Sequence, residues 1–313
     1  MNILVTGGAG FIGSNLCDYL VSKNYHVTII DDLSTGKTSN LSSIIESIIF
    51  YEEKIESFDF NKLNKIDVVV HLAAQPSVPI SIENFGISSS MNILGSINVI
   101  DYCRTHKIPL VYASSSAIYG DLEIGDDQGS EIDLLSPYAT DKYAMELYAK
   151  TAYRLYQLSS IGLRFFNVYG PRQDPSSPYS GVISIFIDRL LNGHNIRING
   201  GFQTRDFVYI EDIIQSIFKS IHIVCEDIIC DQVNVLTGKT ISVDEVSNIL
   251  IKEIGIKVDK EFYELPEGDP KKSDGTSTKM KEFFGHDLKN MISIKTGLVK
   301  TVNFMQDSLR NNE

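Results

Sequence analysis

The chain of 313 residues has no apolar run of membrane-spanning length, and its amino terminus has no charged segment ahead of an apolar core. It has no basic stripe, and its formal net charge of −12 argues against nucleic acid and acidic membrane surfaces as main partners. Cys17, Cys103, Cys225 and Cys230 lack the spacing of metal ligands, and we expect buried free thiols. None of the six histidines shows ligand spacing. These absences predict a cytoplasmic protein with no metal site.

Strand-like and helix-like segments alternate along the chain, which predicts an α/β fold with a Rossmann-type, doubly wound parallel sheet. With 43% hydrophobic residues the chain can form two lobes, expected at 1–170 and, as a smaller α/β lobe, at 171–313, with interleaved elements allowed. Strands are expected at 3–5, 26–30, 48–51, 67–74, 109–113 and 161–166. Helices are expected at 81–106, 138–156, 182–191, 211–223, 243–254 and 293–305.

Three glycines, Gly7, Gly10 and Gly13, lie between the first strand and a stretch of helical periodicity. In such a turn the first glycine permits a tight bend, the second lets backbone approach a pyrophosphate, and the third lets the helix pack closely. The helix amides then face the phosphates. The second strand ends on Asp31 and Asp32, where a carboxylate binds ribose hydroxyls and repels a 2′-phosphate. The pattern predicts a dinucleotide site that prefers NAD to NADP.

Tyr138 and Lys142 lie one helical turn apart, so both side chains can point from the same helix face. An ammonium beside a phenol favours the phenolate, and a positive nicotinamide ring adds to this effect. The pKa of Tyr138 is therefore expected to fall toward neutrality, as a general base requires. Three serines, Ser114 to Ser116, end the preceding strand at the edge where a hydroxyl could meet Tyr138 across a substrate. The alternative is a turn followed by an ordinary surface helix.

Seven segments of the chain carry a resemblance to one known family. They are Thr6-Gly-Gly-Ala-Gly-Phe-Ile-Gly13, His71-Leu-Ala-Ala74, Asn92 in Met-Asn-Ile-Leu-Gly, Ser114-Ser-Ser-Ala-Ile-Tyr-Gly120, Ser136-Pro-Tyr-Ala-Thr-Asp-Lys142, Arg164-Phe-Phe-Asn-Val-Tyr-Gly-Pro171 and Arg205-Asp-Phe-Val-Tyr209. Over nearly its whole length the chain resembles the extended short-chain dehydrogenase/reductase family of NAD-dependent nucleotide-sugar epimerases and dehydratases. Within that family it is most similar to the 4-epimerases of UDP-glucose and UDP-N-acetylglucosamine.

The resemblance implies a role for each matching residue. Tyr138 would be the base, Lys142 would bind the nicotinamide ribose, and Ser115 would supply a hydrogen-bonding hydroxyl, with Ser116 as a second candidate. NAD would stay tightly bound and be regenerated in each cycle. The implied NAD contacts are Gly7, Gly10, Phe11, Ile12, Gly13, Asp31, Asp32, Ile55, Leu72, Ala73, Ala74, Asn92, Ser114, Tyr138 and Lys142. The implied contacts of a UDP-linked sugar are Ser115, Tyr138, Asn167, Val182, Asn199, Arg205, Asp269 and Ser273.

The residues after Ser115 bear on the reaction type. Similar 4,6-dehydratases carry an Asp-Glu pair there and similar uronate decarboxylases carry a glutamate at the second place, whereas this chain has Ser116 and Ala117. The resemblance therefore implies 4-epimerisation of a UDP-hexose or UDP-N-acetylhexosamine through a 4-keto intermediate. Ser273 stands where similar enzymes restricted to plain hexoses carry a bulky residue, so it leaves room for an N-acetyl group.

Two departures from the family keep alternatives open. Pro266 and Glu267 stand where an arginine often grips the diphosphate, and Lys54 stands where an acidic residue usually meets adenine. Arg172 or Arg197 could replace the missing cation. The alternatives are an epimerase for a uronate or another nucleotide sugar, epimerisation at another carbon and, more remotely, a dinucleotide sensor without turnover.

The resemblance also implies a homodimer, formed through helices at about Ser90–His106 and Tyr138–Tyr156. The apolar positions of these helices allow such an interface, although the same faces could belong to the core.

Overall fold

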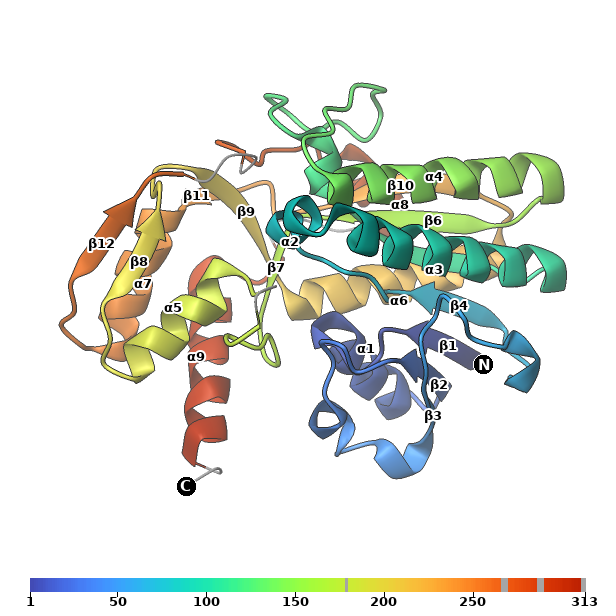
Figure 1. Cartoon of the computed structure of the whole chain (residues 1–313), viewed down its shortest axis with the longest axis horizontal. Coiled ribbons are helices and arrows are strands. Elements are labelled where there is room, and N and C mark those ends of the chain that lie inside the picture. Colours follow the sequence, from blue (N-terminus) through green and yellow to red (C-terminus); the bar gives the residue numbers. More distant parts are fainter. Residues whose placement is uncertain (178–179, 266–269, 286–289, 311–313) are drawn as a thin grey trace. The chain divides into compact units, whose positions relative to one another are not determined.

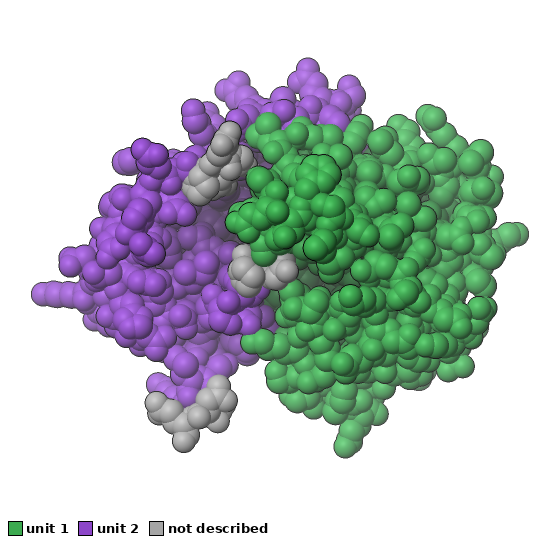
Figure 2. Space-filling model, in the orientation of Figure 1, with its two compact units in different colours: residues 1–118, 134–164, 214–233 green, residues 119–133, 165–213, 234–313 purple. Residues whose placement is uncertain are grey.

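The computed structural model describes residues 1–177, 180–265, 270–285 and 290–310. The chain divides into two compact units, coloured separately in Figure 2. Unit 1 comprises residues 1–118, 134–164 and 214–233, and unit 2 comprises residues 119–133, 165–213 and 234–313. The chain thus passes several times from one unit to the other. The assignment of NAD to residues 1–170 and of the nucleotide sugar to residues 171–313 stays a prediction.

A seven-stranded sheet in the order β3-β2-β1-β4-β5-β6-β10 organises unit 1 (Figure 1). Strand β1 pairs in parallel with β2 and β4, β2 with β3, and β4 with β5. The strand order reverses between β1 and β4, which is the topological switch point of a Rossmann fold. The predicted fold class is confirmed. The strands are β1 Asn2–Thr6, β2 His26–Asp31, β3 Ile48–Glu52, β4 Val68–His71, β5 Leu110–Ser115, β6 Ser160–Phe165 and β10 Cys230–Val235.

Helices cover both faces of this sheet (Figure 1). The helices are α1 Phe11–Ser22, α2 Val78–Glu83, α3 Phe85–His106, α4 Pro137–Tyr156 and α6 Ile210–Glu226. Helices α3 and α4 pack against each other, and α1 contacts α6 through Tyr19 and Phe218, whose ring centroids are 5.2 Å apart. The expected single helix over 81–106 is wrong. Asn84, a residue of low helix propensity, leaves the helical range with φ −123 and ψ 50, so α2 and α3 are separate.

Helix α4, which carries the predicted catalytic pair, begins at a well-capped end. The Ser136 side chain accepts a hydrogen bond from the Ala139 backbone N–H, and Pro137 occupies the first turn, where its missing N–H costs nothing. The helix ends at Tyr156, because Gln157 adopts the left-handed conformation with φ 58. Its buried side packs on α3 and β5. The start of α4 is therefore held by local signals and by the core of unit 1.

Unit 2 contains short strands and four helices among the residues that the structure describes. Its sheets are three-stranded, β11-β9-β7, and two-stranded, β12-β8. The strands are β7 Asn167–Tyr169, β8 Ile196–Asn199, β9 Thr204–Tyr209, β11 Thr240–Ser242 and β12 Lys260–Tyr263. The helices are α5 Val182–Leu191, α7 Val243–Ile254, α8 Thr278–Phe284 and α9 Ile294–Arg310. The expected Ser242 cap of α7 is confirmed and forms a full capping box with Glu245.

The cysteine expectation needs one correction. Cys17 and Cys103 are buried and Cys230 is partly buried, but Cys225 is exposed in the last turn of α6. Cys225 follows directly after Val224, which belongs to the buried stripe of that helix, so its side chain points to a different helix face. No helix in the described ranges has the length and apolar character needed to cross a membrane.

Candidate active site

The glycine turn after β1 forms a tight cradle at the carboxyl edge of the sheet. Gly7 adopts φ 71, and a Cβ there would lie 2.7 Å from a backbone nitrogen of the loop after β4. Gly13 packs so closely on the turn that a side chain would overlap the Gly7 carbonyl oxygen. Gly10 is the N-cap of α1, so the first-turn amides of Phe11 and Ile12 have no acceptor within the helix. Such amides and the helix dipole suit a pyrophosphate.

Asp31, at the end of β2, ties this cradle to the sheet. Its Oδ2 accepts the backbone N–H of Ala9 at 2.9 Å, and its Oδ1 accepts that of Leu33 at 2.9 Å. The side chain is buried, and burial raises its pKa despite these hydrogen bonds. Asp32 is more open, and its Oδ1 accepts the Ser34 N–H at 3.0 Å. Both carboxylates lie where the adenosine ribose was expected, and Asp31 also anchors the glycine turn.

The end of β4 lies on the other side of the switch point, across from the glycine turn after β1. His71 Nδ1 lies 2.7 Å from Thr6 Oγ1, and His71 Nε2 lies 3.3 Å from Ser96 Oγ. Burial, assisted by a neighbouring ammonium, lowers the pKa of His71 to about 3, so the ring is neutral. The Ala73 backbone N–H donates to Thr6 Oγ1 at 3.2 Å, which turns the chain after His71. For this reason the strand is shorter than the expected 67–74.

Asn92, a predicted NAD contact on α3, links the loop after β4 to α4. Its Oδ1 accepts the Gln75 backbone N–H at 2.7 Å, and its Nδ2 donates to Asp141 Oδ2 at 3.1 Å. Another predicted contact, Ile55, is buried against Gly95 of α3, whose absent side chain leaves the necessary space. Asn92 therefore connects the loop after β4 with α4, and Ile55 packs on α3.

Tyr138, at the start of α4, lies close enough to Ser115, at the end of β5, for the serine hydroxyl to act on the pKa of the phenol. Lys142 lies one turn further, and its Nζ donates to the Ala113 carbonyl oxygen at 2.8 Å. Burial lowers the pKa of Lys142 to about 8, opposed by Asp141. Burial raises the pKa of Tyr138, although the Ser115 hydroxyl lowers it. The expected direction is thus wrong for the protein alone, because burial outweighs an ammonium that points to the backbone.

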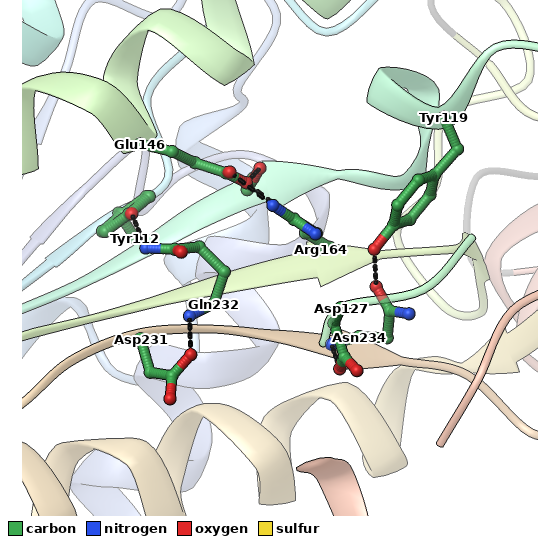
Figure 3. A network of polar contacts seen from close by, with 9 residues as sticks. Tyr112, Tyr119, Asp127, Glu146, Arg164, Asp231, Gln232 and Asn234 are labelled. Atoms are coloured by element: carbon green, nitrogen blue, oxygen red, sulfur yellow. Dashed lines mark hydrogen bonds and ion pairs between the residues drawn. The ribbon is translucent and has the colours of Figure 1, made fainter. Parts of the chain in front are cut away.

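Two further residues at this edge, Glu146 and Arg164, were not predicted from the sequence. The Glu146 carboxylate, one turn beyond Lys142, accepts hydrogen bonds from Ser114 Oγ at 2.5 Å and from Arg164 Nε and Nη2 at 2.9 and 2.7 Å (Figure 3). Ser114, Glu146 and Arg164 are all buried. The available signal was the recurrence of Tyr138, Lys142 and Glu146 at every fourth position, which places them on one helix face.

The remaining predicted substrate contacts belong to unit 2. Asn167 begins β7 and Arg205 lies on β9, so they stand on paired strands. Asn167 Nδ2 donates to the Asp206 carbonyl oxygen at 3.3 Å, and Arg205 is buried with Nη1 donating to the Thr204 carbonyl oxygen at 2.9 Å. The others are Val182 at the start of α5, Asn199 at the end of β8 and Ser273 in a loop, whereas Asp269 lies outside the described residues, as do Pro266 and Glu267.

Unit 1 therefore gathers its predicted residues at one edge, because the carboxyl ends of parallel strands point the same way. Leu72, Ala73 and Ala74 follow β4 there, and Ser116 opens the short turn after β5. The bare glycine cradle, the helix amides and the acidic strand end fit a dinucleotide. Within the described ranges, no group of three or more His, Cys, Asp or Glu side chains is arranged to hold a metal ion.

Comparison with known proteins agrees with this geometry. Residues 3–224 match the NAD dependent epimerase/dehydratase family. A protein of Methanocaldococcus jannaschii, provisionally named UDP-glucose 4-epimerase, is 39% identical over 315 residues, covering 98% of this chain and 99% of the relative. A UDP-glucuronate 4-epimerase from Thermodesulfobacterium geofontis is 32% identical and covers 98% of this chain and 96% of its own.

Solved structures extend the likeness to the whole fold. The UDP-glucose 4-epimerase of Thermotoga maritima, solved with UDP-glucose, matches with a TM-score of 0.92 and 34% identity over 99% of this chain and all of that one. The UDP-N-acetylglucosamine 4-epimerase of Methanobrevibacter ruminantium, solved with UDP-N-acetylmuramic acid, matches with a TM-score of 0.90 and 33% identity over 98% of both chains. The chain thus belongs to the NAD dependent epimerase/dehydratase family, an enzyme family of nucleotide-sugar chemistry whose cofactor is NAD.

Proposed function

We propose that the protein is a 4-epimerase of a UDP-hexose or UDP-N-acetylhexosamine that works through a 4-keto intermediate. One observation carries this proposal: the Tyr138 phenol at the start of α4 lies beside the Ser115 hydroxyl at the end of β5, with the buried Lys142 one turn away. A phenol, a hydroxyl and an ammonium so arranged suit the removal and return of one hydroxyl proton. The family membership supplies the matching redox cofactor.

In this proposal, deprotonated Tyr138 accepts the proton of the sugar C4 hydroxyl and returns it to the C4 oxygen after the ketone has turned over. Ser115 donates a hydrogen bond to that oxygen, and the Lys142 ammonium favours the deprotonated form of Tyr138. When bound, NAD would supply the reversible hydride acceptor that oxidation and reduction at C4 require, and it would be unchanged after each cycle. The glycine cradle would hold its pyrophosphate, and Asp31 and Asp32 its ribose.

The short turn after β5 favours epimerisation over elimination. Ser116 and Ala117 follow Ser115, and neither side chain can serve as the additional acid or base that similar dehydratases carry there. With Tyr138 as the proposed acid–base group, reversible oxidation at one carbon is the reaction that this edge supports best.

Unit 2 supplies the features that suit a nucleotide sugar. The buried guanidinium of Arg205 is a cation of the kind that binds a diphosphate in an acidic protein. Ser273 is small and partly buried, which favours a substrate with an N-acetyl group. Of the two alternative cations, Arg197 is exposed with its Nη2 3.0 Å from the Tyr263 hydroxyl, whereas Arg172 is partly buried. Arg172 is therefore the better candidate for a second phosphate ligand.

The first experiment is an NMR assay of the purified protein, without added NAD, on UDP-N-acetylglucosamine and separately on UDP-glucose. We expect conversion of both to the galacto products, with faster turnover of the N-acetyl substrate. Conversion without added cofactor would also show that NAD copurifies. If neither sugar changes even when NAD is supplied, the proposal fails for these substrates.

A UDP-uronate is the second candidate substrate, because one relative is a UDP-glucuronate 4-epimerase at 32% identity. The same NMR assay with UDP-glucuronic acid decides between them. Exclusive conversion of the uronate would replace the first proposal, and epimerisation of all three sugars would show a broad pocket.

We also propose a homodimer through α3 and α4. Both helices expose large apolar side chains although they already pack against each other. These side chains are Phe85, Ile87 and Leu94 on α3 and Leu147, Tyr148, Leu155 and Tyr156 on α4. An apolar face of this kind is typical of subunit interfaces. Sedimentation equilibrium should give twice the chain mass of 34.9 kDa, and a monomeric mass would refute the dimer.

A further inference from the structure

Three successive turns of α4 each place a polar side chain on the last residues of β5. The pairs are Tyr138 with the Ser115 side chain, Lys142 with the Ala113 carbonyl oxygen, and Glu146 with the Ser114 hydroxyl. The first two pairs belong to the proposed chemistry, whereas the third pair has no role there.

The end of β5 needs this support. In the pairing of β5 with β4, Leu110, Val111 and Tyr112 are the last residues with partners, because β4 ends at His71. On that side the three residues that follow in β5 extend beyond the paired part of the sheet. After Ser115 the chain turns at once into the short helix Ser116–Tyr119. β5 has β6 as its neighbour on the other side, so on the β4 side the position of Ser115 depends on what holds the end of β5 against α4.

The third pair carries a buried carboxylate. Glu146 has a side-chain exposure of 4% and Arg164, on β6, one of 8%, and they form a two-donor ion pair. A buried carboxylate without a counter-charge is strongly unfavourable. Arg164 therefore supplies the counter-charge of the Glu146 carboxylate and fixes its position, and a charged acceptor binds the Ser114 hydroxyl more strongly than a neutral one would.

We propose that Glu146, held in place by Arg164, is a positioning residue for the reaction. Through Ser114 it fixes the end of β5 at the height on α4 at which Ser115 meets Tyr138. It touches neither substrate nor the reacting atoms in this role. The inference rests on the proposed function of Tyr138 as the base.

The first test is the variant Ser114→Ala, which cuts the tether and leaves the ion pair intact. We expect kcat to fall roughly tenfold with KM unchanged, because the proton-transfer geometry is loosened but the binding groups remain. The rising limb of kcat against pH should move to higher pH, since Ser115 then stabilises the Tyr138 phenolate less well. Ser114 is also a predicted NAD contact, so the NAD content of the purified variant must equal that of the wild type.

The matched control is Ser220→Ala. Ser220 is a fully buried serine of α6 whose hydroxyl donates to the Ser216 carbonyl oxygen at 2.8 Å. It makes the same chemical change without touching β5 or α4. We expect a similar small loss of stability with unchanged kcat and pH profile. If Ser220→Ala lowers kcat and shifts the rising limb of the pH profile as much as Ser114→Ala does, these changes reflect a general loss of stability. The positioning role is then refuted.

The second test replaces the pair by Glu146→Met together with Arg164→Met. Apolar replacement of a whole buried ion pair is often tolerated, whereas removal of one partner is not. We expect this double variant to fold and to show the kcat and pH changes of Ser114→Ala, with the same KM and NAD content. Wild-type kcat and pH profile in both this variant and Ser114→Ala would overturn the inference. If the double variant does not fold, Ser114→Ala alone decides.

The variant Tyr138→Phe separates this inference from the function on which it rests. An active Tyr138→Phe enzyme would refute Tyr138 as the base and thus the proposed function. An inactive Tyr138→Phe enzyme beside an unaffected Ser114→Ala enzyme would refute only the positioning role of Glu146.

Discussion

Figure 3 displays buried polar groups from both units, and two of the clusters in it differ in kind. In unit 1, the Glu146 carboxylate faces the Arg164 guanidinium at 2.7 Å. In unit 2, the Asn234 side chain is completely buried, and its Oδ1 accepts the Tyr119 hydroxyl at 2.7 Å. Its Nδ2 donates to two backbone carbonyl oxygens at 3.0 and 3.2 Å, and its backbone N–H donates to Asp127 Oδ2 at 2.8 Å.

The charged pair of unit 1 and the Asn234 amide of unit 2 are therefore expected to serve different purposes. The charged pair borders the helix face of Tyr138 and Lys142, so a shift there changes the groups that exchange a proton. The amide of Asn234 joins segments of unit 2 that are distant in sequence, among them the bridge between Gly125 and Gly275. Changes beside the charged pair should therefore act on turnover, and changes at the amide should act on stability.

The largest effect is expected for Tyr138→Phe, which removes the hydroxyl that unit 1 positions. We expect kcat to fall by about 10² to 10⁴, the usual contribution of a general acid–base group. The unfolding midpoint and the NAD content should stay near those of the wild type. The matched control is Tyr153→Phe, which removes a hydroxyl from a partly buried tyrosine near the end of α4. Retained turnover in Tyr138→Phe would contradict the assignment of turnover to this part of unit 1.

The next largest effect is expected for Asn234→Ala, as a loss of stability. It removes the hydrogen bonds that the Asn234 side chain makes to the Tyr119 hydroxyl and to the Gly125 and Thr276 carbonyl oxygens, although the Gly125 oxygen still accepts the Thr276 N–H at 3.0 Å. Each lost buried hydrogen bond costs about 1 kcal/mol, so we expect a loss of about 3 kcal/mol in urea unfolding. The exposed Asn192, changed to Ala in the same way, should cost less than about 0.5 kcal/mol. An Asn234→Ala protein of wild-type stability but with strongly reduced kcat would reverse the assignment of tasks.

Local signals explain which parts of the fold could be predicted. Helices α5 and α7 have the expected bounds and α4 begins one residue earlier than expected, because caps and apolar periodicity act within a few residues. The strands of unit 2 were not predicted. Strand β8 pairs with β12, which lies about sixty residues later, and each has only four residues. Such short segments carry too little pattern to reveal a partner at that distance.

The candidate site also contains some residues that could be predicted from the sequence and others that could not. The spacing of Tyr138 and Lys142 and the serines after β5 predicted a set that the structure brings together. The ion pair of Glu146 with Arg164 was missed, because it joins α4 to β6 and no local spacing links the two. For the protein alone the pKa direction of Tyr138 was also wrong, since burial is a property of the assembled core and helical spacing reveals only the neighbouring charge.

The smallest effect is expected for His71, a buried side chain of unit 1. Its ring is neutral, in contrast to the carboxylate of Glu146. The pKa of His71 is about 3 in the fold, against an ordinary value of 6.5 that applies to the unfolded chain. Between these values the unfolded chain binds a proton that the fold does not, so stability is complete above pH 6.5 and falls on acidification. We expect this residue to lower the unfolding free energy by about 1.5 kcal/mol from pH 6.5 to pH 5.

The measurement must separate His71 from other buried groups that titrate in the same range. The buried carboxyls Asp206 and Asp212, with pKa values raised to about 6, act in the opposite sense. The quantity to measure is therefore the difference between the wild type and His71→Gln in urea titrations at both values of pH. That difference should shrink on acidification. A pH-independent result for His71→Gln would mean that the ring is protonated inside the fold.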